Sequence, residues 1–409
     1  MEQWKKYQLK DVTTLLGDGL HGTPKYDKNG TVFFINGNNL VDGKIEIKDS
    51  TKRVSEDEAN KYRKNLNHRT ILVSINGTIG NVAKYQGEAC ILGKSACYFN
   101  VAEDFDLNFI YYVVASQQFK NSIMHLATGT TIKNVSLETM RNYSFVAPSI
   151  NEQKRISSLL SSLDNKIDLN RRINDNLEQQ AQALFKSWFV DFEPFKDGKF
   201  VESELGMIPE GCRVGKAEDF YNINIGKTPP RKEQIWFSSN SSDYTWVSIS
   251  DLGSCGRFVF TSSEFLTHEA IKRHNIILVP KDTILLSFKL TIGRVGIAGT
   301  ELTTNEAIAR FITSDENREY TYFLLKGYNY EKLGSTSSIA TAVNSKIIKA
   351  MVVLMPDKEI LKAFSSLTKP YFDQILRNEQ ESIRLTILRD TLLPKQMSGE
   401  LKINATEVL

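Results

Sequence analysis

Cysteine and histidine are scarce in this sequence, and neither is spaced for metal binding. No two cysteines form a Cys-x-x-Cys pair, and the histidines show neither zinc-finger spacing nor paired spacing. We therefore expect reduced, mostly buried thiols and no metal site. The residues are Cys90, Cys97, Cys212, Cys255, His21, His68, His125, His268 and His274.

Long hydrophobic runs are also absent. No stretch reaches the roughly 18 consecutive apolar residues that would indicate a membrane-spanning helix. The opening MEQWKKYQLKDV lacks the apolar core of a secretory signal, so we expect a cytoplasmic protein. Of 409 residues, 41% are hydrophobic and 24% are charged, which is typical of a globular protein with two or three domains.

Strong charge of either sign is missing as well. The net charge is +3, and the excess of cations lies within residues 1–150, whereas segments 151–200, 201–356 and 357–409 are each neutral. There is no polybasic tail and no acidic block. If the protein binds nucleic acid, its cations must gather on one face, or a partner must supply many of the phosphate contacts.

Catalytic motifs are the last notable absence. The GKT at residues 226–228 is no phosphate-binding loop, because Tyr221 replaces the required first glycine and two prolines would interrupt the following helix. There is no Gly-x-Gly-x-x-Gly turn, no Asn/Asp-Pro-Pro-aromatic tetrad of an amino-methyltransferase, no nuclease metal motif and no Gly-x-Ser-x-Gly elbow. We therefore expect a non-catalytic protein.

What the sequence does contain is a duplication. ILVSINGTIGNV at 71–82 and ILLSFKLTIGRV at 284–295 agree at seven of twelve positions. FINGNNLVDGKI at 34–45 parallels WVSISDLGSCGRF at 246–258, and VSLETMRNYSFVAP at 135–148 parallels VNSKIIKAMVVLMP at 343–356. The difference in residue number between matching segments varies from about 205 to 213. This variation indicates two copies of one fold that differ by loop insertions.

Each copy has short β-branched and aromatic runs, which predict strands, followed by a long segment of helical periodicity. The first helix is predicted from Ser149, as its N-cap, to about Phe189, and the second from Asp357, with a kink or break at Pro370. The predicted apolar stripes comprise Ile156, Leu159, Leu160, Leu163, Ile167, Ile173, Leu177, Leu184 and Trp188 in the first, and Ile360, Phe364, Leu367, Tyr371, Ile375, Ile383, Ile387 and Leu392 in the second.

These patterns predict an α+β fold in which two β-rich domains are separated by two long antiparallel coiled-coil helices with pseudo-twofold symmetry. The expected boundaries are 1–148 for the first domain and 149–191 for the first helix. A connector and the second domain then occupy 192–356, and the second helix and a tail occupy 357–409.

Several segments stand out together and in order: GDGLHGTPKY at 17–26, GKTPPRKEQIW at 226–236 with YTWVSISDL at 244–252, the two TIG strands, and TGTTIKNVSLETMRNYSFVAPSINEQKRI at 128–156. In these segments, and over essentially its whole length, the chain resembles the DNA-specificity subunit of type I restriction–modification systems. PDKEILKAF at 356–364 departs from the family pattern, because it does not keep the Glu-Gln pair of SINEQKRI.

The resemblance implies a chain that does no chemistry itself. It would carry two modification subunits, which are adenine methyltransferases that use S-adenosylmethionine, and would recruit a restriction subunit that cuts DNA. The implied target is bipartite double-stranded DNA, in which each domain reads one half and the helices fix the spacer. An alternative from another class is a coiled-coil interaction scaffold whose two β-rich modules bind protein.

DNA contacts are expected from loop residues of the types that read base edges and phosphates. The candidates in the first domain are Thr23, Lys25, Tyr26, Asn36, Asn38, Asn39, Lys94, Thr130, Thr131, Lys133 and Asn134. Those in the second domain are Lys227, Thr228, Arg231, Lys232, Ser248, Ser250, Asp251, Lys289, Arg294, Ser337, Ser338 and Thr341. An aromatic cluster near the end of the first helix offers a partner surface or, alternatively, simple burial between the helices: Phe185, Trp188, Phe189 and Phe192. For Trp246, core burial is favoured over stacking on a base.

Overall fold

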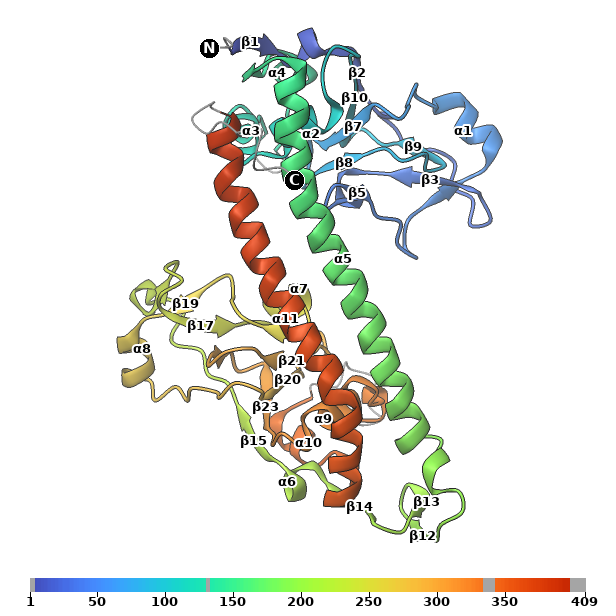
Figure 1. The fold of residues 1–409 in the computed structure, drawn as a ribbon, viewed down its shortest axis with the longest axis vertical. Helices are drawn as coiled ribbons and strands as arrows, with labels where there is room; N and C mark the ends of the chain where they lie inside the picture. Colours follow the sequence, from blue (N-terminus) through green and yellow to red (C-terminus); the bar gives the residue numbers. More distant parts are fainter. Residues whose placement is uncertain (1–3, 130–132, 334–342, 398–409) are drawn as a thin grey trace. The chain divides into compact units, whose positions relative to one another are not determined.

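The computed structural model describes residues 4–129, 133–333 and 343–397. The chain divides into two compact units, one formed by Met1–Ile167 with Arg384–Leu409 and the other by Asp168–Ile383. Each unit combines a β-rich domain with part of two 40-residue helices, α5 (Ile150–Phe189) and α11 (Lys358–Met397) (Figure 1). The predicted α+β class with two domains and two long helices is confirmed.

The first unit is built on an antiparallel sheet with strand order β2-β10-β7-β8. A second sheet has the order β6-β3-β9, in which β3 and β9 are parallel. The first strand of the domain, β1, pairs with its last strand, β11. The strands are β1 (Lys5–Gln8), β2 (Thr13–Asp18), β3 (Val32–Ile35), β4 (Leu40–Val41), β5 (Lys44–Ile45), β6 (Arg53–Val54), β7 (Thr70–Ser74), β8 (Val82–Lys84), β9 (Cys90–Leu92), β10 (Ala96–Val101) and β11 (Ser144–Ala147). The short helices are α1 (Glu56–Tyr62), α2 (Leu107–Ala115), α3 (Gln117–His125) and α4 (Leu137–Asn142).

The second unit repeats this topology. Its main sheet runs β15-β23-β20-β21 with β18 added at the edge, β17 pairs in parallel with β22, and β14 pairs with β24. The strands are β12 (Phe200–Ser203), β13 (Gly206–Pro209), β14 (Cys212–Lys216), β15 (Asn222–Ile225), β16 (Phe237–Ser238), β17 (Tyr244–Val247), β18 (Phe258–Val259), β19 (Phe265–Leu266), β20 (Ile284–Ser287), β21 (Val295–Ala298), β22 (Thr303–Thr304), β23 (Ile308–Ile312) and β24 (Val352–Pro356). The helices are α6 (Ala217–Phe220), α7 (Ile249–Ser254), α8 (His268–Arg273), α9 (Arg318–Lys326) and α10 (Ser345–Lys349). The matching strand orders confirm that the sequence repeat is a repeat of the fold.

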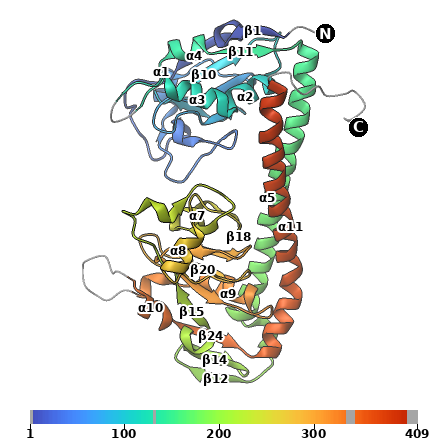
Figure 2. The same cartoon turned by 90° about the vertical axis from the view of Figure 1, so that its left-hand side faces the viewer.

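Within each unit α5 and α11 lie side by side and antiparallel (Figure 2). In the second unit Asn174 lies opposite Asn378, whose Nδ2 donates to Asn174 Oδ1 at 2.8 Å, and Trp188 packs on Phe364 with ring centroids 5.9 Å apart. In the first unit the guanidinium of Arg389 donates to a carboxylate of α5. Residue numbers therefore rise along one helix as they fall along the other.

The residues that each long helix buries are only partly those of its predicted apolar stripe. Ile156 and Leu160 are buried as expected, but Ile173 is 37% exposed, while Asn170 and Asn174 point inward. The buried positions 170, 174 and 178 of α5 follow one another in steps of four, so the seam passes through these two asparagines. On α11, Leu367, Ile383 and Ile387 are likewise exposed, and Leu361, Thr368, Phe372 and Asn378 are buried instead.

The predicted break at Pro370 is wrong, because α11 continues through it without interruption. Proline removes one N–H from the helix, which leaves the carbonyl of Ser366 without its usual donor. Both Pro370 and Ser366 are exposed, so water can solvate that carbonyl. The expected N-cap of this helix is confirmed: Ile360 N–H donates to Asp357 Oδ1 at 2.9 Å.

Carboxylates on α5 tie the helices to each domain. In the first unit Asp164 accepts from Tyr112 Oη of α2 at 2.6 Å and from the Arg389 guanidinium of α11 at 2.7 Å. In the second unit Glu178 accepts from Tyr322 Oη of α9 at 2.6 Å and from Arg257 Nε at 2.7 Å. The same kind of tether therefore occurs in both copies, with the domain helix supplying a tyrosine.

All four cysteines are free, and Cys90, Cys97 and Cys212 are buried. Burial raises the pKa of each of the four thiols, so they are protonated at neutral pH. No helix among the residues described has the length and hydropathy needed to cross a membrane.

Candidate nucleic-acid interface

In the first unit, four loops meet at one edge of the sheets. The β7–β8 loop joins the β9–β10 turn through a bond from Ile75 N–H to Ser95 O at 2.9 Å. That turn joins the end of β3 through a bond from Gly93 N–H to Ile35 O at 2.8 Å. The loop after β2 is attached by a third bond, to Leu92 O at 2.7 Å. Backbone hydrogen bonds thus hold these loops as one surface.

The second unit has the same edge with the same three bonds. Phe288 N–H donates to Ala307 O at 3.0 Å, and Asn305 N–H donates to Val247 O at 3.0 Å. The loop after β15 donates to Thr304 O at 2.9 Å. Because three main-chain bonds recur between equivalent loops, the duplication preserves this edge in atomic detail.

The β7–β8 and β20–β21 hairpins, which carry the repeated TIG sequence, also close in the same way. In each, a serine N–H donates across the hairpin and a glycine with positive φ donates back to the serine carbonyl. These bonds are Ser74 N–H to Asn81 O at 2.8 Å, Gly80 N–H to Ser74 O at 2.9 Å, Ser287 N–H to Arg294 O at 2.9 Å, and Gly293 N–H to Ser287 O at 3.0 Å. The φ angles of +86° at Gly80 and +89° at Gly293 confirm that these glycines serve the turns.

The loops after β2 and after β15 approach the edge closely at a glycine. A Cβ added at Gly19 would lie 2.2 Å from Leu92 O, and one added at Gly226 would lie 2.0 Å from Asn305 O. Only glycine fits at either position. Each loop then continues into a Thr-Pro pair, so the polar residues that follow are presented from a fixed starting point.

Several predicted DNA contacts turn out to build these turns. Asn39 Oδ1 accepts from the Asn36 N–H at 3.0 Å, and Asp251 Oδ2 accepts from the Ser248 N–H at 2.8 Å, in equivalent turns of the two copies. Burial raises the pKa of Asp251, but hydrogen bonds from Ser248 and Ser263 hold it below its usual range. These side chains serve their own turns, and their predicted contacts with DNA stay predictions.

Arg294 likewise stays within the protein. Its guanidinium donates to Ile249 O at 2.7 Å, just as Asn81 Nδ2 of the first copy donates to Leu40 O at 3.0 Å. Both residues attach the TIG hairpin to the turn that follows β3 or β17. Arg294 is therefore an anchor of the hairpin, and its predicted contact with DNA stays a prediction.

The edge of the first unit is polar and hollowed. A pocket of 580 Å³ there includes Lys94 and Asn134 among its lining residues, together with Asp18, His21 and Asn76. His21 Nε2 lies 2.6 Å from Asp18 Oδ2, and the histidine side chain is 70% exposed. A hollow with exposed cationic and amide groups suits a phosphate or a base edge.

The edge of the second unit holds an organised ionic group. Arg231 donates two bonds of 2.9 Å to Glu264, and its guanidinium lies 4.4 Å from the Phe237 ring centroid and 4.5 Å from that of Trp246. Trp246 is 1% exposed, which confirms its predicted burial. The aromatic rings and Glu264 together orient the guanidinium plane. Because both terminal nitrogens already donate to Glu264, Arg231 can contact a phosphate or a guanine only through its remaining N–H groups or by leaving this carboxylate.

A second carboxylate completes this group. Glu306 accepts a hydrogen bond from the Thr228 hydroxyl. Burial raises its pKa, but that bond and the positive charges of Lys289 and Arg231 hold the pKa of Glu306 below its usual range. Lys289, Arg231 and Thr228 therefore lie near one ionised carboxylate, on one side of the domain.

The remaining predicted contacts fall into two sets. Exposed on or beside these loops are Thr23, Lys25, Tyr26, Asn38, Lys94, Lys133, Asn134, Lys227, Arg231, Lys232, Ser250 and Lys289, with Thr228 half-buried. Outside the described residues lie Thr130, Thr131, Ser337, Ser338 and Thr341. The ammonium group of Lys227 is partly engaged, since it donates to His274 O at 2.6 Å.

Sequence reasoning missed four residues of these edges: His21, Asn76, Glu306 and Leu290. The repeat alignment could have found one of them, because Leu290 stands where the first copy has Gly77. The other three carry no sequence signal, since only the fold brings them beside the predicted residues.

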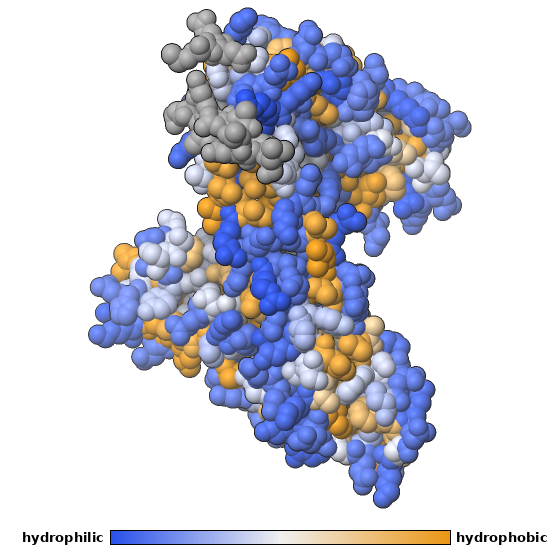
Figure 3. Space-filling model, in the orientation of Figure 1, coloured by the Kyte–Doolittle hydropathy of each residue, from blue (hydrophilic) through white to orange (hydrophobic). Residues whose placement is uncertain are grey.

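The aromatic cluster at the end of α5 packs mainly within the second unit. Phe189 is 6% exposed, and Trp188 packs on Phe364 and on Phe195. Phe185 and Phe189 also line a groove of 920 Å³. Figure 3 shows apolar surface in this unit, close to where Figure 1 draws the end of α5. Phe192 packs on the connector, with its ring 6.1 Å from that of Phe200.

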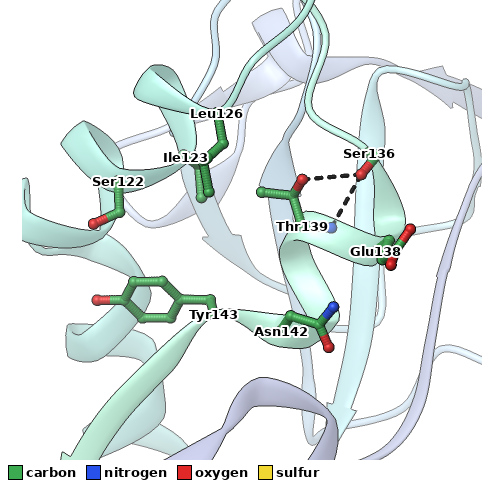
Figure 4. Close-up of a pocket in the computed structure, with 8 residues that line it drawn as sticks. All are labelled: Ser122, Ile123, Leu126, Ser136, Glu138, Thr139, Asn142 and Tyr143. Atoms are coloured by element: carbon green, nitrogen blue, oxygen red, sulfur yellow. Dashed lines mark hydrogen bonds between the residues drawn. The ribbon is translucent and has the colours of Figure 1, made fainter.

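A smaller pocket of 270 Å³ lies between α3 and α4 of the first unit (Figure 4). Its Ser136 hydroxyl caps α4, accepting from Thr139 N–H at 3.0 Å and lying 2.9 Å from Thr139 Oγ1. Ile123, Leu126 and Tyr143 form its apolar wall. The Ser136 and Thr139 groups joined in Figure 4 are used in capping α4, and we assign no ligand to this pocket.

Comparison with known proteins gives concordant matches. The family model described as type I restriction modification DNA specificity domain matches residues 1–179 and 209–385. The type I restriction enzyme MjaIX specificity subunit of Methanocaldococcus jannaschii is 29% identical over 306 residues, covering 72% of this chain and 69% of that protein. The HindI specificity subunit of Haemophilus influenzae is 26% identical over 333 residues, covering 66% and 72%. Among solved structures, the type I S subunit from M. genitalium aligns with a TM-score of 0.53 at 18% identity, covering 97% of this chain and 96% of that one.

Proposed function

Because this chain belongs to the type I restriction–modification DNA specificity family, we propose that each of its two β-rich domains reads one half of a bipartite DNA target. The chain contributes recognition and assembly, and partner subunits contribute the chemistry.

The matched loop edges carry this proposal. Two copies of one fold keep the same three backbone bonds at the same edge, while the side chains presented there differ. The first edge offers Lys94 and Asn134, and the second offers Arg231, Lys289 and Thr228. A constant scaffold with variable polar tips is what two readers of different sequences require.

The helix pair supplies the spacing in this proposal. Two readers on one chain meet both half-sites only if their separation and helical phase are fixed. The antiparallel pairing of α5 and α11 supports this role, because the buried Asn174–Asn378 bond favours one register over others. Tethering also makes the second contact intramolecular, which raises the overall affinity.

We further propose that two methyltransferase subunits dock on this chain and bring S-adenosylmethionine, and that restriction subunits join them. The apolar groove beside Phe185 and Phe189 supports a docking role for the end of α5, since large apolar grooves on a surface mark interaction sites. Trp188 and Phe192 remain candidates for contact with the same partner subunit.

The test is to express the chain with its methyltransferase partner in a host that lacks other adenine methylation, and to sequence the methylated adenines. The proposal predicts one split motif with a spacer of constant length. A contiguous motif, or methylation without sequence preference, would contradict it. A scaffold that binds only protein would leave the methylation pattern unchanged when the loop edges are mutated.

A further inference from the structure

Leu290 is the most exposed large apolar residue of the chain as described, and it adopts an unfavourable backbone conformation. Its side chain is 100% exposed, and its φ of +57° lies in the left-handed region. It forms the tip of the β20–β21 hairpin, directly after Lys289. No protein atom shields this leucine from water, so folding gains nothing from burying it.

The equivalent position of the first copy holds glycine, the residue that this backbone conformation favours. Gly77 occupies the equivalent tip with φ of +74°, which is a conformation that glycine adopts without steric cost. Leucine there brings its Cβ close to the following carbonyl, which is unfavourable. Strained residues that fold stability does not explain are concentrated at functional sites.

The hairpin beneath Leu290 is rigid. Ser287 Oγ accepts from Arg294 N–H at 3.0 Å and donates to Thr291 O at 2.6 Å, so the serine side chain bridges the two arms of the loop. The Arg294 guanidinium fixes the same loop to the start of α7. A Cβ at Gly293 would contact the Tyr330 ring at 3.2 Å, which shows how closely this end of the hairpin packs against the domain. A protruding side chain on a stiff support is suited to insertion.

The hairpin also stands at the candidate interface. Lys289, next to Leu290, acts electrostatically on Glu306, as does Arg231. Glu306 is in turn held by Thr228. An apolar tip beside an exposed lysine can approach DNA, because the cation attracts the phosphates while the tip meets the stacked bases.

We propose that Leu290 is a wedge that inserts between adjacent base pairs in the half-site read by the second domain. This rests on the proposed function and deepens it. The inserted isobutyl group separates one base step and so favours sequences with weakly stacked steps at that position. The first domain, with Gly77 at the equivalent tip, leaves its half-site stacked, and the two halves of the target are therefore deformed differently.

The experiment uses the full chain assembled with its methyltransferase partner, bound to a duplex that carries the methylated motif. Adenines other than the methylated ones are replaced singly by 2-aminopurine, whose fluorescence rises when it is unstacked. We expect a several-fold rise at one step of the second half-site. Leu290→Gly should abolish that rise in fluorescence and weaken binding about tenfold. Leu290→Met should keep the rise and the affinity of the natural chain, because methionine is also an effective wedge.

Two further variants make the test decisive. Met207→Ala removes a 56% exposed side chain from the β12–β13 hairpin and should change neither signal. Gly77→Leu should add a rise in the first half-site, since no heavy atom lies within 4 Å of its added Cβ. Leu290→Gly relieves an unfavourable φ, so it should fold at least as well as the natural chain.

The outcomes separate this inference from the proposed function. If a split motif is methylated but Leu290→Gly leaves both the fluorescence rise and the affinity unchanged, the wedge is refuted and the reading function stands. If no split motif is methylated, the proposed function itself fails.

Discussion

Replacing Glu178 should weaken the second unit strongly. This glutamate is 6% exposed and accepts hydrogen bonds from Tyr322 Oη at 2.6 Å, from Arg257 Nε at 2.7 Å and from the Lys326 ammonium. The three donors come from α9 and from the segment before β18, so the carboxylate joins α5 to two parts of the domain. Leucine at this position would leave buried donors without an acceptor.

The magnitude follows from what each donor loses. Removing one partner of a buried ion pair costs about 3–5 kcal/mol. Arg257 keeps a second partner, Asp175 at 2.6 Å, and Lys326 is 40% exposed, so water compensates in part. We therefore expect Glu178→Leu to lower the free energy of unfolding by about 3 kcal/mol, at the low end of that range. Glu178→Gln keeps the shape and one acceptor and should cost about half as much.

Urea unfolding followed by tryptophan fluorescence measures this loss, because Trp188, Trp236 and Trp246 belong to the second unit and only Trp4 belongs to the first. The matched control is Glu193→Gln, which removes an exposed pair with Lys196 at 2.8 Å. Its cost should stay below about 0.5 kcal/mol. A loss for Glu178→Leu as small as that of the control would show that Glu178 does not hold α5 to the domain.

The same carboxylate gives a pH dependence with a definite sign. Burial raises the pKa of Glu178, but hydrogen bonds from Lys326 and Tyr322 and the charge of Arg257 hold it below its usual range. A folded pKa below the unfolded value of about 4.3 stabilises the fold above that pH, and the stabilisation disappears as pH falls through the folded value. The stability gap between the natural chain and Glu178→Gln should therefore be constant from pH 7 to 5 and close below about pH 4. A gap that widens in acid would contradict this sign.

Three further predictions concern the interface and the spacer. Lys94→Ala should reduce the slope of log binding constant against log salt by about 1 without changing the motif, whereas Lys199→Ala in the connector should leave the slope unchanged. Gly226→Ala places a Cβ 2.0 Å from Asn305 O, so the loop must move, and discrimination in the half-site read by the second domain should fall. Gly22→Ala, whose Cβ meets nothing within 4 Å, should leave competition binding unchanged. Inserting four residues, about one turn or 6 Å, at matched places in α5 and α11 should lengthen the methylated spacer, and an unchanged spacer would exclude the ruler role.

The sequence predicted the architecture because the fold is present twice. The strands β7 and β20 are buried along their whole length and have nearly the same apolar residues. Each strand prediction could therefore be checked against the matching segment of the other copy. The helix limits followed from capping chemistry, as at Asp357. Pro370 was misjudged because the helix penalty depends on whether the freed carbonyl reaches water, and exposure is not visible in one sequence.

The candidate interface was only partly predictable. Residue type alone cannot distinguish a base reader from a turn-forming residue, since Asn39 and Asp251 have the donors and acceptors that suit both roles. The anchoring role of Arg294 was missed because its carbonyl partner lies 45 residues away in the chain. Leu290 escaped notice because an apolar letter in a hairpin predicts core, and only its exposure and φ show otherwise.

The most direct test of the account exchanges the first domain, residues 1–148, for the equivalent domain of a relative and then maps methylated adenines across the host genome. The account predicts that one half of the split motif changes, while the other half and the spacer remain as they were. A map in which both halves change, or neither does, would contradict the claim that each domain reads its own half of the target.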